Sequence, residues 1–205
     1  EKSSAGRIEA TIYPSAQLGS DAECVEYVKA GTQDILITSL NLITDHCPRL
    51  EVLILPYIFP EKDKAIQAID ELMPYFNDYI TKKANMRLLD LPISNYRKLL
   101  TVDPIMSMEE LRKTKFRLAP SPIMLKTFEA YDIKPTIIPW VELFNAMQLG
   151  TVNAFECDPS VLVSARFNEV VRYVTDVDWM TQVSVMVISE INYQKLPDDL
   201  KKAVD

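Results

Sequence analysis

Nucleophilic or metal-binding chemistry in this chain would depend on three cysteines and one histidine. The cysteines are Cys24, Cys47 and Cys157, and the histidine is His46. The cysteine count is odd, the spacing is wide and no CxxC motif occurs, which argues against a disulfide framework and against a zinc site. We therefore expect no metal and no cofactor, and a catalytic triad would have to be built around His46.

A thiol hydrolase with Cys157 as nucleophile and His46 as base is the enzymatic alternative. It requires the base within hydrogen-bond reach of the thiol. His46 lies in the loop-like segment Asp45-His46-Cys47-Pro48, where a histidine is more often a plain surface residue. Because no catalytic motif accompanies the pair, we expect that the protein is not an enzyme.

The composition is that of an ordinary soluble globular protein. Hydrophobic residues make up 48% and charged residues 25% of the 205 residues, and the length allows one or two domains. The net charge of −7 argues against nucleic acid as the main partner but not against a small anionic ligand.

No apolar run reaches the roughly 18 residues of a membrane span. The abrupt start at EKSSAGR leads us to expect that a targeting segment has been removed.

A helix–Gly–strand join occurs twice along the chain. In the first half, a helix that starts at the capping box Ser20–Glu23 ends at Gly31 and leads into a short strand. In the second half, a helix over 141–149 ends at Gly150 and leads into a strand over 152–155. Such a join also recurs by chance in any α/β protein.

The residues that follow the two joins are candidate ligand-binding residues. Strands that alternate with helices at this spacing predict α/β units and a mostly parallel sheet. Ligands in open sheets of this kind bind at the carboxyl ends of strands. Thr38-Ser39 and Glu156-Cys157 are therefore expected to face each other across a cleft between two halves.

Further elements follow from periodicity and capping signals. A long helix is expected over 62–84, broken at Pro74. Shorter helices are expected after the capping box Ser107–Glu110 and after the N-cap pair Ser121-Pro122. Strands are expected at 7–13, 35–37, 86–91, 97–102, 115–119 and 136–138.

Six short motifs, in this order, give the chain a resemblance to a known family. They are YPSAQLG at 13–19, GTQD at 31–34, LPYIF at 55–59, KFR at 115–117, the run from Glu142 to Glu156, and EVVRY at 169–173. Each motif is weak alone, but the order and spacing are fairly specific and cover nearly the whole chain. On these residues the sequence resembles the solute-binding proteins of tripartite ATP-independent periplasmic (TRAP) transporters, the DctP-type family.

The resemblance implies an α/β fold of the type II-like periplasmic-binding-protein architecture. Two lobes would close on a small organic acid and deliver it to the TRAP membrane permease subunits. We expect lobe I to comprise 1–94 plus 182–205 and lobe II to comprise 95–181. A sensor or orphan ligand-binding module of the same fold is the alternative.

The resemblance also implies a periplasmic or lipid-anchored extracellular location and a monomer. Three unpaired cysteines fit poorly with an oxidising compartment. Family members usually carry a further strand and helix before position 1 and long helices after position 205. The resemblance therefore implies a truncated version of the fold, with apolar faces left uncovered.

Two arginines take their expected roles from the resemblance. Arg117 matches the family arginine that forms a bidentate salt bridge to the ligand carboxylate, which suits a planar guanidinium. Its alternative is a surface residue in the basic run 112–117. Arg97 matches a second arginine at the pocket edge, and a strand-end surface charge is its alternative.

The remaining expected site residues also follow from the resemblance. Trp140 matches an aromatic wall against the ligand, or alternatively packs in the core. Thr38 and Ser39 match the lobe I pocket edge, where short hydroxyls donate to ligand oxygens. Trp179 lies where many members carry His or another polar residue near the pocket rim, and an ordinary buried aromatic is its alternative.

The chain departs from the family where members often read DGQEN. It has Asn153-Ala-Phe-Glu156-Cys157 there, so the ligand-contacting Asn is Cys157, a weak hydrogen-bonding group. Cys157, Phe155 and Trp140 would suit a carboxylate less polar than a hydroxyl-rich sugar acid of the sialic acid kind. Glu156 is expected to be structural, because a carboxylate beside an anionic ligand would repel it.

Overall fold

A computed structural model describes residues 4–204 of the chain. Within them, a seven-stranded sheet has the order β1-β7-β3-β6-β4-β5, and β2 also pairs with β7. The strands are β1 Ile35–Ser39, β2 Met86–Asp90, β3 Ile93–Thr101, β4 Phe116–Leu118, β5 Thr136–Ile137, β6 Ala154–Cys157 and β7 Tyr173–Ser189. The helices are α1 Asp21–Ala30, η2 Leu40–Leu42, η3 Pro48–Ile54, α2 Lys62–Ala84, α3 Met108–Arg112, α4 Pro122–Ala130, α5 Trp140–Gln148, α6 Val161–Ser164, η4 Phe167–Glu169, α7 Glu190–Gln194 and α8 Asp198–Val204.

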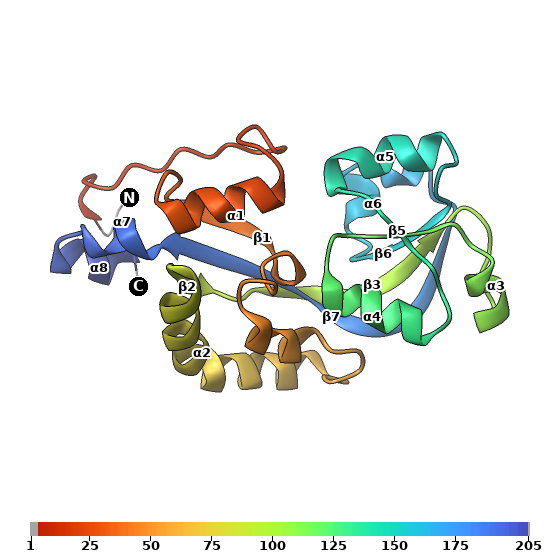
Figure 1. Cartoon of the computed structure of the whole chain (residues 1–205), viewed down its shortest axis with the longest axis horizontal. Helices are drawn as coiled ribbons and strands as arrows, with labels where there is room; N and C mark the ends of the chain where they lie inside the picture. The colour runs from red at the N-terminus through yellow and green to blue at the C-terminus, as the bar shows by residue number, and fades with distance from the viewer. Residues whose placement is uncertain (1–3, 205) are drawn as a thin grey trace.

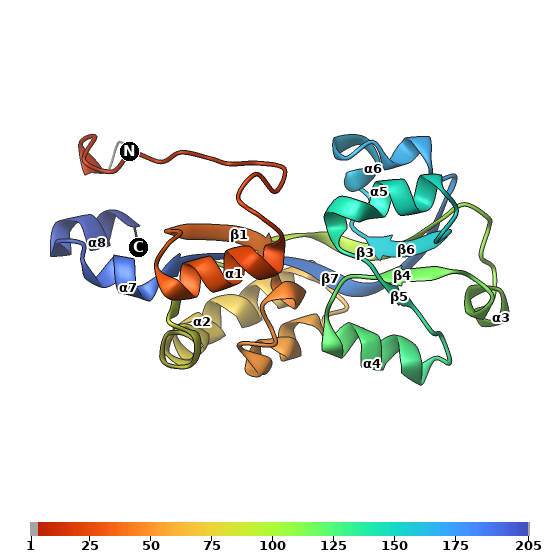
Figure 2. The ribbon, with the colours of Figure 1, turned by 45° about the horizontal axis from the view of Figure 1, so that its top comes forward.

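The elements gather into two groups that are joined by the long strands β3 and β7 (Figure 1). The first group holds α1, α2, β1 and β2, with α7 and α8 at the far end, and the second holds α3 to α6 with β4 to β6. Figure 2 shows the same division after the molecule is turned. β7 pairs with β1 and β2 in the first group and with β3 as it enters the second. The β3–β7 register shifts between Arg97 and Leu99.

The prediction of a mostly parallel sheet is wrong. Among the strand pairs of the described chain, only β4–β5 and β4–β6 are parallel. β7 runs antiparallel to β1, β2 and β3, and β3 runs antiparallel to β6. The spacing of helices and strands along the sequence correctly indicates the crossover connections through α4 and α5, which join parallel strands. It carries no information about the direction of the long strand β7 in the sheet.

Both helix–Gly–strand joins form as predicted. At the start of α1, Ser20 N donates to the Glu23 carboxylate at 2.8 Å, and Glu23 N donates to Ser20 Oγ at 3.4 Å. Gly31 follows α1 with φ 76°, and Gly150 follows α5 with φ 68°. Glycine suits both positions because a side chain disfavours the left-handed region.

Two predicted elements differ in the structure. Residues 7–13 form no strand, and Ile12 is 84% exposed. Polar–apolar alternation defines two faces but supplies no neighbouring strand, and no described strand pairs with this segment. α2 is not broken at Pro74 but runs unbroken through it. The proline removes one N–H donor, while buried side chains before and after it hold both halves of α2 on the core.

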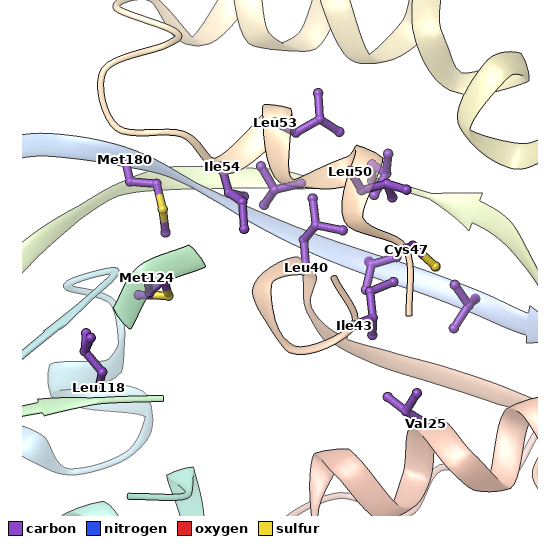
Figure 3. Packing of buried hydrophobic residues seen from close by; sticks show 14 of the residues in the cluster. Val25, Leu40, Ile43, Cys47, Leu50, Leu53, Ile54, Leu118, Met124 and Met180 are labelled. Atoms are coloured by element: carbon purple, nitrogen blue, oxygen red, sulfur yellow. The ribbon is translucent and has the colours of Figure 1, made fainter. Parts of the chain in front are cut away.

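One apolar cluster extends from the first group of elements into the second. It includes residues of α1, η3 and α2 together with Leu118 from β4 and Met124 from α4. Figure 3 shows part of it, with Val25 from α1, Ile54 from η3 and Met124 from α4. A second cluster lies in the second group, around Phe155 and the residues of α5 that face it.

Candidate functional site

Arg117 is a buried cation without a carboxylate partner. Its side chain projects from β4, and the residue is 2% exposed. Nε donates to the carbonyl oxygen of Ile138 at 2.8 Å. Within residues 4–204, no carboxylate lies at ion-pair distance from it. The surface alternative for this residue is therefore wrong.

The charge of Arg117 is destabilised by its surroundings but is kept at neutral pH. Burial lowers the pKa of Arg117 to about 10, the negative charge of Glu156 acts in the opposite direction, and the positive charge of Arg97 lowers it further. Burial of a charge is costly unless an opposite charge compensates it. The guanidinium is thus a protonated donor whose Nη groups suit an incoming anion.

Arg97 is equally buried but is already paired. It is 4% exposed, and its partner Glu156 is fully buried. Nη2 donates to Glu156 Oε1 at 2.7 Å, Nε donates to Glu156 Oε2, and Nη1 donates to Gln182 Oε1. Burial is the largest single influence and acts to lower the pKa of Arg97, but the charge of Glu156, its hydrogen bond and the nearby Cys157 and Asp158 together raise that pKa. The surface alternative is wrong for this arginine too.

Ser39 and Glu156, which follow the two joins, are connected by one hydrogen-bond chain. Gln182 Nε2 donates to Ser39 Oγ at 3.1 Å, and the same amide accepts from Arg97, which binds Glu156. Ser39 Oγ in turn donates to Asn41 Oδ1 at 2.5 Å. The structure thus brings together the ends of β1 and β6, as the repeated join suggested.

Thr38 leads to an acidic residue that the sequence reasoning missed. Its Oγ1 donates to Asp21 Oδ1 at 2.5 Å. The charge of Asp21, in the first group, also acts to raise the pKa of Arg117 in the second group, although less than the charge of Glu156 does. Asp21 follows the capping serine, where an acidic residue is ordinary for the first turn of a helix. Because helix capping alone explains an acidic residue at this position, the sequence did not point to a second role for Asp21.

The expected aromatic residues pack mainly against other aromatic rings. Phe155 is fully buried, with its ring centroid 4.9 Å from that of Phe167. Trp140 lies at the start of α5, and its ring centroid is 5.2 Å from that of Phe167. Trp179 is 5% exposed and meets Phe128 edge to face at 5.4 Å. Its Nε1 is buried without a hydrogen-bond partner in the described structure.

Cys157 and His46 do not form a catalytic pair in the described residues. Burial raises the pKa of the Cys157 thiol, although the charge of Arg97 acts to lower it. The imidazole of His46 lies between η2 and η3, with Nδ1 3.3 Å from Lys29 Nζ and Nε2 3.5 Å from Glu26 Oε1. No hydrogen bond joins these two side chains in residues 4–204, so the geometry of a thiol hydrolase is not formed.

Two hollows lie in the second group of elements, and neither is lined by Arg97 or Arg117. One, of about 240 Å³, includes Thr101, Pro104 and Lys113 in its lining, and the other, of about 310 Å³, includes Phe144 and Arg172. Residues 4–204 hold no group of three His, Cys, Asp or Glu side chains placed to bind a metal ion. No helix in the same range is long and apolar enough to cross a membrane.

Two groups of α/β elements joined by the long strands β3 and β7 are the architecture of a two-lobed binding protein. The comparisons with known proteins agree. The chain belongs to the bacterial extracellular solute-binding protein family 7, the DctP family, whose family model matches residues 1–205.

Curated relatives match over almost the whole chain at low identity. Solute-binding protein RD1_1052 of Roseobacter denitrificans is 27% identical, over 97% of this chain and 61% of its own length. The sialic acid-binding periplasmic protein SiaP of Vibrio cholerae is 26% identical, over 100% of this chain and 64% of its own. The chain therefore spans less than two thirds of the length of these relatives.

Solved structures show the same fold. A TRAP periplasmic solute-binding protein from Roseobacter denitrificans with bound L-galactonate superposes with a TM-score of 0.93 at 25% identity, over 99% of this chain and 68% of that one. An open, ligand-free one from Rhodobacter sphaeroides gives a TM-score of 0.76 at 32% identity, over 99% and 66%. The predicted two-lobed binding-protein fold is thereby confirmed.

Proposed function

We propose that this chain forms the ligand-binding part of an extracytoplasmic solute-binding protein that captures a small organic acid. The observation that carries the proposal is Arg117, a buried guanidinium that has no carboxylate partner within residues 4–204. A ligand carboxylate would supply the missing charge and two parallel, charge-assisted hydrogen bonds. Family membership supports the same role.

The capture mechanism in this proposal is closure of two lobes around the acid. We take lobe I as 1–94 plus 182–205 and lobe II as 95–181. Arg117 of lobe II binds the carboxylate, while Asp21 and Thr38 of lobe I, which bond to each other, offer groups for ligand hydroxyls. The Ser39 hydroxyl already bonds to Gln182 and Asn41. A ligand that contacts both lobes binds the closed state better than the open one, so it shifts the equilibrium toward closure.

The residues beside Arg117 favour an acid of moderate polarity. Cys157 offers only a weak hydrogen-bonding group, and its thiol stays protonated because burial raises its pKa. Trp140 supplies apolar area at the start of α5. Related proteins bind sugar acids, as the L-galactonate complex shows for its own chain. We expect this chain to take a short hydroxy acid with fewer hydroxyl groups than a sialic acid.

The partners in this proposal are the membrane permease subunits of a TRAP-type transporter. We place the protein in the periplasm, or held outside the cell by a lipid anchor, as a monomer without catalytic activity. The sensor alternative uses the same ligand site but passes the closed state to a signalling partner. Neighbouring genes for permease subunits would favour transport, and a neighbouring kinase gene would favour sensing.

A thermal-shift screen of small acids tests the capture function. The full-length protein is heated with D-glucuronate, L-galactonate, D-erythronate and shorter hydroxy acids. A binding acid raises Tm progressively with concentration, because it stabilises only the folded state. Absence of a shift with every acid would refute the proposal. An equal shift in an Arg117→Met variant would refute the role of Arg117.

A further inference from the structure

Gln182 lies where β7 passes from the first group of elements to the second, and its side chain bonds to residues of both. Its Oε1 accepts from Arg97 Nη1, and its Nε2 donates to Ser39 Oγ at 3.1 Å. Arg97 holds Glu156 of β6, whereas Ser39 ends β1. A single amide therefore joins the buried ion pair to the end of β1.

The chemistry of its partners fixes the direction of this amide. Arginine can only donate hydrogen bonds, so the oxygen of Gln182 must face Arg97 and the NH₂ group must face Ser39. Ser39 accepts from Gln182 and gives its own proton to Asn41 Oδ1 at 2.5 Å. Every bond in the chain thus points away from Arg97. Hydrogen bonds aligned in this way polarise and strengthen one another.

The hydrogen-bond chain starts on the strand next to the proposed ligand site. Arg117 in β4 pairs with Phe155 in β6, and the next residue of β6 is Glu156, the partner of Arg97. The charges of Arg97 and Glu156 both act on Arg117, so a carboxylate that binds Arg117 would change the field at the ion pair. Nη1 of Arg97, which does not bond to Glu156, bonds to Gln182, so a shift of Arg97 would alter the bonds that lead to Ser39.

The sheet itself does not need this side chain. Backbone pairing already aligns Ser39 with Ser184 and Arg97 with Met180. Gln182 is only half-buried, so an apolar side chain of the same length can occupy its place. The amide is thus dispensable for strand pairing but is needed for the hydrogen-bond chain.

We propose that Gln182 is a positioning residue that couples capture of a carboxylate at Arg117 to the end of β1 and to η2. Gln182 does not touch the acid but acts through Arg97 and Ser39. The closed, acid-bound state is held shut partly by this chain of bonds. The inference rests on the proposed function.

A Gln182→Met variant of the full-length protein tests the coupling, because methionine keeps the length of the side chain and removes both hydrogen bonds. Stopped-flow tryptophan fluorescence with D-glucuronate, L-galactonate and D-erythronate gives kon and koff. We expect koff to rise about tenfold, the size of one hydrogen bond to a charged group. We expect kon to change less than about twofold. Gln67→Met, which removes one exposed bond to Glu71, is the control.

A second variant, Ser39→Ala, breaks the same chain without altering β7. If the two residues act through one chain, the double variant dissociates no faster than Gln182→Met alone. The inference would be overturned if Gln182→Met dissociated from the acid with the wild-type koff. It would also be overturned if the koff increases of the two single variants multiplied in the double variant. A wild-type protein that binds none of the acids would instead refute the proposed function, and this inference with it.

Discussion

Arg97 and Arg117 lie on strands of one sheet, with β6 between them, yet they meet opposite surroundings. Arg97 is paired with the carboxylate of Glu156 and also bonds to Gln182. Arg117 is equally buried, and within residues 4–204 its side chain bonds only to the carbonyl oxygen of Ile138. Burial lowers the pKa of both, and only at Arg97 do the neighbouring groups, Glu156 first, together outweigh burial. The difference separates an arginine whose charge is compensated within the fold from one that, in our proposal, binds an external anion.

Glu156→Gln is expected to give the largest effect, because it leaves Arg97 as an uncompensated buried charge. Breaking a buried ion pair at one side costs about 3–5 kcal/mol of unfolding free energy. Urea unfolding followed by circular dichroism measures the loss. Glu169→Gln, which removes an exposed partner of Arg166, is the control. A loss below about 1 kcal/mol would remove the distinction between the two arginines.

Arg117→Met is expected to act on binding and not on folding. Loss of the guanidinium should weaken acid binding at least about 100-fold, the lower range for a buried charge pair. The free energy of unfolding without ligand should change by less than about 1 kcal/mol, because no internal carboxylate is left unpaired. Isothermal titration calorimetry and urea unfolding measure the two quantities. Arg112→Met, from the exposed end of the same basic run, is the control.

The opposite result for Arg117→Met would contradict this comparison. It would consist of a strongly destabilised variant that still binds the acid with wild-type affinity. Arg117 would then be a structural residue like Arg97.

The pH dependence of binding sharpens the comparison further. The folded-state pKa of Arg117, about 10, lies below its value in the unfolded chain. Its buried charge therefore lowers stability at every pH below 10, and this cost is relieved as the pH rises above 10. Acid affinity should stay constant from about pH 6 to about pH 9 and fall above about pH 10. Titration calorimetry over this range, with circular dichroism as a check on folding, measures it.

A fall in affinity already between about pH 7 and about pH 9 would show that another group controls binding. Its involvement would move the proposed site away from Arg117.

The Cys157 thiol should show the smallest effect. Two guanidinium groups nearby would suggest an activated thiolate, but burial is the larger influence and raises the pKa of the thiol. We expect alkylation by iodoacetamide at neutral pH to be at least about tenfold slower in the folded protein than in guanidinium chloride. A Cys157→Ser variant identifies the contribution of this residue. Fast labelling of Cys157 in the folded protein would revive the thiol hydrolase.

Features that depend only on neighbouring residues could be predicted from the sequence. The capping box at Ser20 and the left-handed glycines at 31 and 150 depend on neighbouring residues only, and each forms as predicted. The strand at 7–13 and the mostly parallel sheet depend on partners that lie far away in the sequence. Periodicity carries no information about those partners, so both predictions are wrong.

The residues of the candidate site also divide into those that the sequence could predict and those that it could not. The guanidinium at position 117 could be anticipated from residue type and from the family resemblance. Its lack of a carboxylate could not, because that depends on Glu156 turning to Arg97 instead. Gln182 and Asp21 were missed since their partners lie more than ten residues away in the sequence. The one signal for Gln182 is a polar residue within an apolar strand.

The long strand β7 has a mechanical consequence. Because β7 runs through both groups without a flexible linker, the two groups cannot rotate freely relative to each other. Any such rotation has to twist the pair of strands β3 and β7 that connects them. Two register shifts interrupt the pairing of β3 with β7, between Ile93 and Tyr96 and between Arg97 and Leu99, and Asp178 with its φ of 40° lies opposite the second. A bend at the second shift would lie next to the ion pair of Arg97 and Glu156.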